Sequence, residues 1–181
     1  LARALARDPQ MRERRRAIIT APASVRSVGE AVMAADRLLE TAKAQADSQV
    51  SERNAREKAE LMRQLGMDEG ESVTKASRTM IRQLEEDQKR RSKRALTDAI
   101  DRALIDLLAI YRDVLMIQVG GDGELINTDL ADLVGQIASD STPRQTLARV
   151  DHIETARKRL VSNGNPLLVL EDMAISLRPQ A

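Results

Sequence analysis

Two long helical patterns on either side of a glycine-flanked break constrain the fold of this chain more than any other feature. The break is residues 66–70, GMDEG, and glycine is a strong punctuator of helices. Before it, a helix is predicted to open at Ser24 or Ser27, and Ser27-x-x-Glu30 has the pattern of a capping box. Apolar residues then recur three and four apart, which places them on one helical face. They are Val25, Val28, Val32, Ala35, Leu39, Ala42 and Ala46.

The second long pattern is predicted to run from about Ser72 to about Gln118. Its first half is polar, whereas its second half is apolar almost all round, as in a central buried helix. Antiparallel pairing of the two patterns matches apolar half to apolar half, and it places Val50 near Glu86. We therefore predict a helical hairpin with its base in a core and a projecting charged section at residues 45–92.

The remainder of the chain also has the sequence signals of helices. Residues 120–129 are predicted to be a loop whose end caps the next helix. Thr142 followed by Pro143 predicts another helix start, and Asn165 followed by Pro166 predicts the last one. Aromatic residues make up 1% of the chain and sheet formers are scarce, so an all-α helical bundle is expected. The candidates for the cap after the loop are Asn127, Thr128 and Asp129.

Few residues have the chemistry of an active site. The chain has no cysteine, and its single histidine, His152, lies off the apolar stripe of its helix. A calcium loop starting at Asp122 fails, because its fifth and sixth positions are Ile126 and Asn127 rather than an oxygen ligand and glycine. No glycine-rich phosphate loop and no nucleophile–base pair is present. We predict no enzyme activity, no cofactor and no metal in this region.

The run KRRSKR, residues 89–94, is the strongest charge feature. The whole chain has 29 basic and 28 acidic residues, whereas proteins that grip phosphates usually have a clear basic excess. Acids just upstream predict the helical ion pairs Glu86–Arg90 and Asp87–Arg91. A solvated helix face is the first interpretation, and a partner or DNA contact is the second. The residues of that second interpretation are Lys89, Arg90, Arg91, Lys93 and Arg94.

The pair Arg112-Asp113 is unusual because it lies within the apolar run LLAIYRDVLMI. Two charges in such a run need a rim position or partners, since an unpaired buried charge is costly. We predict a buried or interfacial ion pair with a structural role.

Three segments together resemble one known family. They are LARALARDPQMRERRRAI near the start, RRSKRALTDAIDRALIDLLAIYRDVL in the second long helix, and the ending NGNPLLVLEDMAISL. In this order and spacing they resemble the end of the lid domain and the C-terminal collar domain of bacterial clamp-loader subunits. The resemblance is to the delta-prime type of DNA polymerase III, in the form found in high-GC Gram-positive bacteria.

The resemblance implies a domain organisation. Residues 1–20 would be the end of an AAA+ lid domain and a connector, and residues 21–181 a helical collar domain. The charged section 45–92 would be an insertion with no role in the family. The full protein would carry an AAA+ module before this region and belong to a DNA polymerase holoenzyme.

The resemblance also implies partners. Collar domains pack side by side in a five-subunit ring, so the partners would be the clamp-loader ATPase subunits and delta. DNA would be contacted only indirectly, no membrane or small-molecule substrate would be involved, and the location would be the cytoplasm. The candidate subunit-contact residues are Leu104, Leu108, Tyr111, Arg112, Leu115, Asn165, Pro166, Leu168 and Met173.

Two other classes of protein remain open at this point. An unrelated all-α dimerisation or ligand-sensing domain of a transcription regulator would pair with itself and enclose an apolar pocket. An enzyme on a helical scaffold is disfavoured because the expected site residues are missing.

Overall fold

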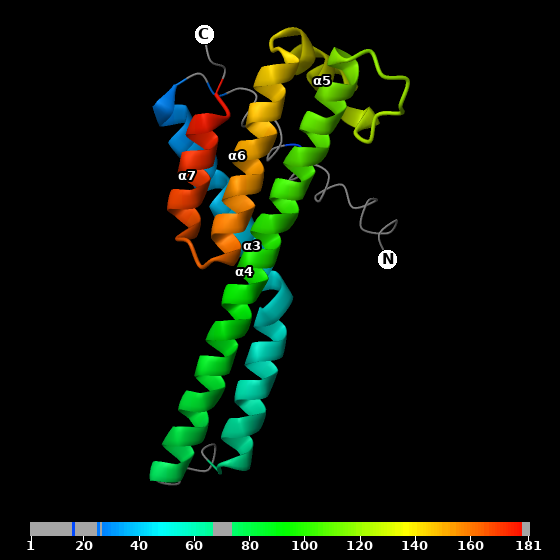
Figure 1. Cartoon of the computed structure of the whole chain (residues 1–181). Coiled ribbons are helices and arrows are strands. Elements are labelled where there is room, and N and C mark those ends of the chain that lie inside the picture. Colours follow the sequence, from blue (N-terminus) through cyan, green and yellow to red (C-terminus); the bar gives the residue numbers. More distant parts are fainter. Residues whose placement is uncertain (1–15, 17–24, 26, 67–73, 179–181) are drawn as a thin grey trace. The chain divides into compact units, whose positions relative to one another are not determined.

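The computed structural model describes residues 16, 25, 27–66 and 74–178, and these residues contain helices and no strand (Figure 1). The predicted all-α fold is therefore confirmed. Two of the helices are much longer than the others. The elements are α3 (Val28–Gln64), α4 (Lys75–Gln118), the short 3-10 helix η2 (Thr128–Leu130), α5 (Ala131–Ser139), α6 (Pro143–Val161) and α7 (Pro166–Ser176).

The chain divides into two compact units, and both long helices contribute to each of them. We call the first unit the body; its described residues are those up to Thr41 and those from Ile100 onward. We call the second unit, Ala42–Ala99, the hairpin. The predicted charged section, residues 45–92, falls inside the hairpin. That it is an insertion and that it projects stay predictions, and the predicted lid segment 1–20 lies outside the described residues apart from Arg16.

The core of the body is built from large aliphatic side chains. Helix α4 supplies the central set, as its nearly continuous apolar pattern predicted, and α6 and α7 lie side by side against each other (Figure 1). Burial of one such side chain contributes roughly 1.5–3 kcal/mol. The most deeply buried members are Ile100, Leu104, Leu107, Ile110, Val114, Val134, Ile153, Leu170 and Leu177.

Local capping signals set most helix boundaries. At α3, the Ser27 hydroxyl accepts from the Glu30 N–H at 3.1 Å, and the Glu30 carboxylate accepts from the Ser27 N–H at 3.3 Å. Thr142 forms the same reciprocal box with Gln145 at the start of α6. Asn165 accepts from the first N–H groups of α7. These three predicted caps are confirmed.

The turn between α6 and α7 requires residues that tolerate unusual backbone geometry. Asn163 has a φ of 63°, in the left-handed region that asparagine enters more readily than most residues. A Cβ on Gly164 would lie 2.8 Å from the Arg159 carbonyl oxygen, so only glycine fits there without a shift of the backbone. The predicted end of α6 at this pair is confirmed.

Two predicted helix starts differ in detail from the structure. The second long helix begins at Lys75 rather than near Ser72, because the Thr74 hydroxyl accepts from the Ser77 N–H and caps it. Asn127 precedes η2, but its side chain makes no capping bond there. Its amide donates to Asp113 instead, so a long-range partner has replaced the local one.

The helix pairing within the hairpin also differs from the predicted register. Val50 packs in a small cluster with Ala46 and Ala95, to which Leu96 adds a partly buried side chain, so Val50 does not oppose Glu86. Small side chains at a contact let two helices approach closely. The best apolar match therefore decides the register, and simple counting from the glycine-flanked break misplaced it.

Candidate interaction surfaces

A row of polar contacts joins the two helices of the hairpin, α3 and α4, beyond its apolar cluster. The Arg91 guanidinium donates to the Asn54 amide oxygen and to the Glu57 carboxylate, each at 2.8 Å. The Gln88 amide donates to the Asn54 backbone carbonyl at 2.9 Å. We call these four residues the seam. They give the hairpin directional contacts where it has few apolar ones.

Hydrogen bonds make Glu57 a strongly acidic group. The bond from Arg91 is the largest cause, the bond from Arg53 comes next, and together they lower the pKa of Glu57 to about 2. Arg53 lies one helical turn before Glu57 and donates to it at 2.8 Å. Glu57 is therefore charged at neutral pH and holds two arginines.

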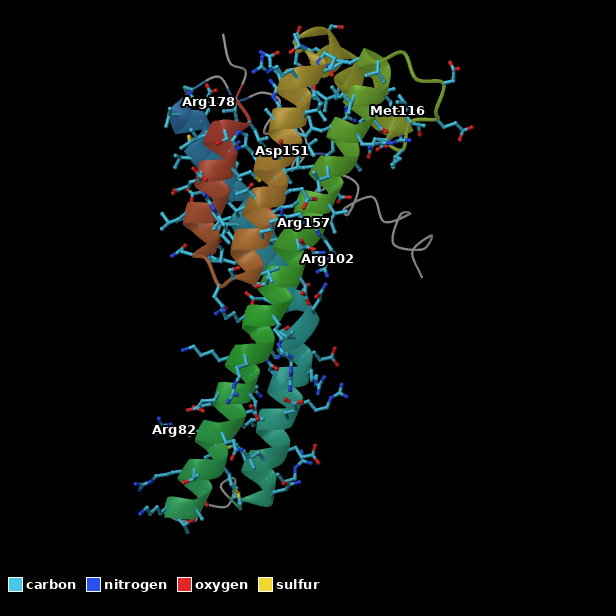
Figure 2. All side chains as sticks on the ribbon, viewed as in Figure 1. Arg82, Arg102, Met116, Asp151, Arg157 and Arg178 are labelled. Carbon is cyan, nitrogen blue, oxygen red and sulfur yellow. The ribbon has the colours of Figure 1, made fainter. Side chains whose placement is uncertain are left out.

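The basic run is not a single surface. Arg91 is turned into the seam and is 27% exposed, so the predicted pair Asp87–Arg91 was wrong: Glu57, across the hairpin, is the better-placed acid. The predicted pair Glu86–Arg90 is confirmed at 3.8 Å. The remaining basic residues of the run, Lys89, Lys93 and Arg94, are exposed. Figure 2 shows a further exposed arginine of α4, Arg82, which pairs with Glu86 at 3.3 Å.

In the body, Asp113 fastens the loop after α4. Its carboxylate is fully buried and accepts from Arg112 at 2.7 Å, which confirms the predicted ion pair. It also accepts from the N–H of Ile126 at 3.1 Å, and from the N–H and side-chain amide of Asn127, each at 2.8 Å. Arg112 reaches the loop as well, through the Glu124 carbonyl at 2.9 Å. Two neighbouring charges of α4 thus hold the loop at three of its residues.

The environment of Asp113 keeps its carboxylate ionised. Burial alone would raise its pKa, but the bonds from Arg112 and from the two loop residues outweigh burial, so the pKa lies below its usual range. The same loop packs closely on Met116, labelled in Figure 2. A Cβ at Gly121 or Gly123 would lie 2.7 or 2.6 Å from the Met116 methyl carbon, so larger residues there would displace that side chain.

Polar contacts also connect α4 with α6. Arg157 donates to Asp101 at 2.7 Å and to Glu154 at 3.0 Å, and its position on α6 is labelled in Figure 2. The Gln118 amide donates to the Ser141 carbonyl at 2.7 Å and its oxygen accepts from the Thr146 hydroxyl at 2.9 Å. None of these contacts was predicted, and those between α4 and the later residues could not be, since no local spacing relates residues so far apart in sequence.

Between these contacts, Arg149 of α6 stacks on Tyr111 of α4. The guanidinium carbon lies 5.9 Å from the ring centre, within the range of a cation–π contact. Both residues are buried, at 7% and 3% exposure. Burial raises the pKa of the Tyr111 hydroxyl to about 12, although the Arg149 charge acts in the opposite direction.

The candidate subunit-contact residues separate by burial. Leu104, Tyr111 and Met173 are core residues of the body. Leu108, Leu115 and Pro166 are half-buried, whereas Arg112, Asn165 and Leu168 are exposed, with Leu168 at 62%. The Asn165 side chain is already used in capping α7. A contact role stays a prediction for the whole set, and the half-buried and exposed members are the accessible part of it.

The described residues contain no cluster of acids and histidines able to hold a metal ion. His152 is exposed on α6, as its place off the apolar stripe predicted. No helix in the described part of the chain is long and apolar enough to cross a membrane.

The fold is thus an all-α domain in which buried polar groups fasten helices and loops to one another. Comparison with known proteins gives the family. A model of the family described as "DNA polymerase III, delta subunit, C terminal" matches residues 77–178. The chain belongs to this family. The match covers most of α4 and every later described helix, and it begins after α3 has ended.

A curated relative is also a subunit of DNA polymerase III. The DNA polymerase III subunit delta' of Bacillus subtilis (strain 168) is 39% identical over 72 residues, which are 40% of this chain and 22% of the relative. The match therefore spans about a fifth of the length of that relative. The resemblance to a delta-prime C-terminal region is confirmed, whereas the high-GC Gram-positive form stays a prediction. No solved structure matches the chain.

Proposed function

We propose that this region is the non-catalytic assembly module of a clamp-loader subunit of the delta-prime type. It would hold its subunit in the ring that places the sliding clamp on primed DNA. The observation that supports this most is the family match over residues 77–178, reinforced by the identity to a delta' subunit. The same match, rather than any missing site, supports the prediction that the region is not an enzyme. Cofactors have no role in this proposal, and the expected location is the cytoplasm.

The body is the part that would make the ring contact. It contains α5, α6 and α7, all of which lie in the matched range. Its accessible apolar side chains include Leu108, Leu115 and the exposed Leu168. Apolar side chains of this kind are typical of the fully buried core of a protein interface. The expected partners are the ATPase subunits and delta.

The hairpin would be an accessory of this module. Its surface is formed largely of paired charges, such as Arg56 with Glu52 at 2.8 Å and Lys58 with Glu85 at 3.4 Å. Exposed pairs of this type contribute little to stability or affinity. DNA contact by Lys89, Arg90, Lys93 and Arg94 is a second role for the hairpin, but the acids beside Arg90 weigh against it.

A co-purification experiment tests the proposal. The full-length protein that contains this region would be expressed with the other clamp-loader subunits, beside a form that lacks residues 25–178. The intact protein should join the complex and the shortened form should not. Assembly of both forms to the same extent would contradict the proposal. The alternative, a regulator domain that pairs with itself, gains no support from the family match and would appear as a self-associating dimer.

A further inference from the structure

We infer that Arg149, stacked on Tyr111, is the receptor for a carboxylate group of a neighbouring subunit. The inference rests on the proposed role in ring assembly and adds to it a single anchoring site. The ligand would be an aspartate or glutamate side chain of the partner that enters beside the stacked pair.

Arg149 differs from the other buried polar side chains of the body. Asp113 and Asn127 bond to each other, and Thr146 bonds to Gln118. Arg149 contacts the Tyr111 ring, and among the described residues it has no hydrogen bond and no ion pair. Arg157, on the same helix, is paired with two acids. Since burying a charge is costly unless it is paired, Arg149 stands out as an incomplete site.

Among the described residues, no acid forms an ion pair with Arg149. On α6, the residues one turn from Arg149 are Gln145, Thr146, His152 and Ile153, none of them acidic. On α4, the carboxylate nearest in sequence to Tyr111 is Asp113, which already accepts three hydrogen bonds from the loop and one from Arg112. Within the described part of the chain, the site therefore lacks a negative charge, and we infer that the partner supplies it.

The geometry leaves the guanidinium accessible to such a group. In the described part of the chain, no fully buried side-chain nitrogen lacks a hydrogen-bond partner. The unbonded nitrogens of Arg149 therefore keep contact with solvent, although the side chain as a whole is 7% exposed. Stacking on a ring uses the face of the guanidinium and leaves its in-plane N–H groups free for a carboxylate.

The surroundings favour a protein partner over a free anion. Leu108 and Leu115 lie one turn to either side of Tyr111 on α4, and both are half-buried. Apolar side chains that frame a buried charge exclude water when a partner covers them, which strengthens the ion pair. Arginine and tyrosine are also the residues most enriched among the energetic centres of protein interfaces.

The test uses the full-length protein and the remaining clamp-loader subunits, with dissociation rates measured by surface plasmon resonance. Arg149→Met keeps the stacking stem and removes the charge. It should raise the dissociation rate about tenfold or more, because removing one member of a desolvated charge pair acts mainly on dissociation. Arg149→Lys restores the charge without the planar fork and should recover part of the loss. Arg94→Met, an equal loss of charge in the hairpin, should leave the dissociation rate unchanged.

Thermal unfolding of the free proteins separates this role from a structural one. Arg149→Met should unfold at the same temperature as the wild type or higher, since it removes an unpaired buried charge. Unchanged dissociation of Arg149→Met or Arg149→Lys would overturn the inference, as would a lower unfolding temperature with unchanged dissociation. If the wild type itself does not bind, the proposed function fails and the inference fails with it. If the wild type binds and the Arg149 substitutions do not change its dissociation, the inference fails while the proposed function stands.

Discussion

The body is stabilised by one kind of interaction and the hairpin by another. The body buries large aliphatic side chains completely or almost so, among them Ile100, Leu107, Ile153 and Leu170 at 1% exposure or less. In its described residues, the hairpin has one small apolar cluster, Ala46 with Val50 and Ala95, and beyond it the hydrogen bonds of the seam. Cavities should therefore damage the body most, whereas loss of charge should damage the hairpin most.

The difference has a functional consequence. A region whose stability comes from close packing presents a constant surface, as a ring contact requires. A region held by a few hydrogen bonds and exposed ion pairs opens locally at a lower free energy. On this comparison, we expect the body to make the permanent contact of the proposed assembly and the hairpin to respond to conditions.

The largest expected effect comes from a cavity in the body. Leu170→Ala removes a fully buried side chain of α7 and should lower the free energy of unfolding by about 2–5 kcal/mol. The measurement is equilibrium unfolding in urea. Leu168→Ala, two residues away and 62% exposed, is the matched control and should change stability by about 0.5 kcal/mol or less. Equal effects of both substitutions would contradict the assignment of the core.

The next largest loss of stability is expected from removing the hydrogen bonds that hold the loop after α4. Asp113→Ala leaves the buried amide of Asn127 and the Ile126 N–H without their acceptor, which should cost about 2–4 kcal/mol. Hydrogen exchange at the Ile126 and Asn127 amides should accelerate. Equilibrium unfolding in urea should show the loss of stability. Asp122→Ala, in the exposed part of the loop, should change neither quantity. Retained protection at both amides in Asp113→Ala would show that the loop is held by other contacts.

A smaller effect is expected from the seam. Arg91→Met removes the bonds to Asn54 and Glu57 and should lower the local stability of the hairpin by about 1 kcal/mol. The readout is hydrogen exchange of hairpin amides, while protection in the body stays unchanged. Arg94→Met removes an exposed charge from the same helix and serves as control. If both substitutions speed exchange alike, the run KRRSKR acts as one surface and the distinction made for Arg91 is wrong.

The smallest effect is the pH dependence of the hairpin. The pKa of Glu57 is about 2 in the folded chain and about 4.5 when its partners are lost. A lowered folded pKa stabilises the hairpin above about pH 4.5, and this contribution disappears as the pH falls towards about 2. Hairpin amides should therefore lose protection over this range. In Glu57→Gln the loss over this range should be smaller, and in Glu60→Gln it should equal that of the wild type.

Local features of the fold were predictable from the sequence, because their causes lie within one helical turn. The caps at Ser27, Thr142 and Asn165 each depend on residues three positions apart or fewer. The Glu86–Arg90 pair joins residues four positions apart on one helix. The ion pair of Arg112 with Asp113 was also predictable, since two charges within an apolar run need partners.

Long-range contacts could not be predicted in this way. Arg91 bonds to Glu57, 34 residues away, rather than to Asp87 on its own helix. Asn127 bonded to Asp113 instead of capping η2, and Arg149 met Tyr111 across two helices. Each choice depends on which side chains the tertiary packing brings together. The hairpin register failed for the same reason, because one good contact between small residues outweighs symmetry about the turn.

The most direct test of the account is the assembly of a form whose hairpin has been shortened. Replacing residues 54–91 by a short glycine-rich turn keeps the cluster of Ala46, Val50 and Ala95 and removes the seam. The full-length protein with this change should join the other clamp-loader subunits with wild-type affinity, measured by sedimentation or surface plasmon resonance. Loss of assembly on shortening the hairpin, with the body still folded, would contradict the claim that the body makes the permanent contact.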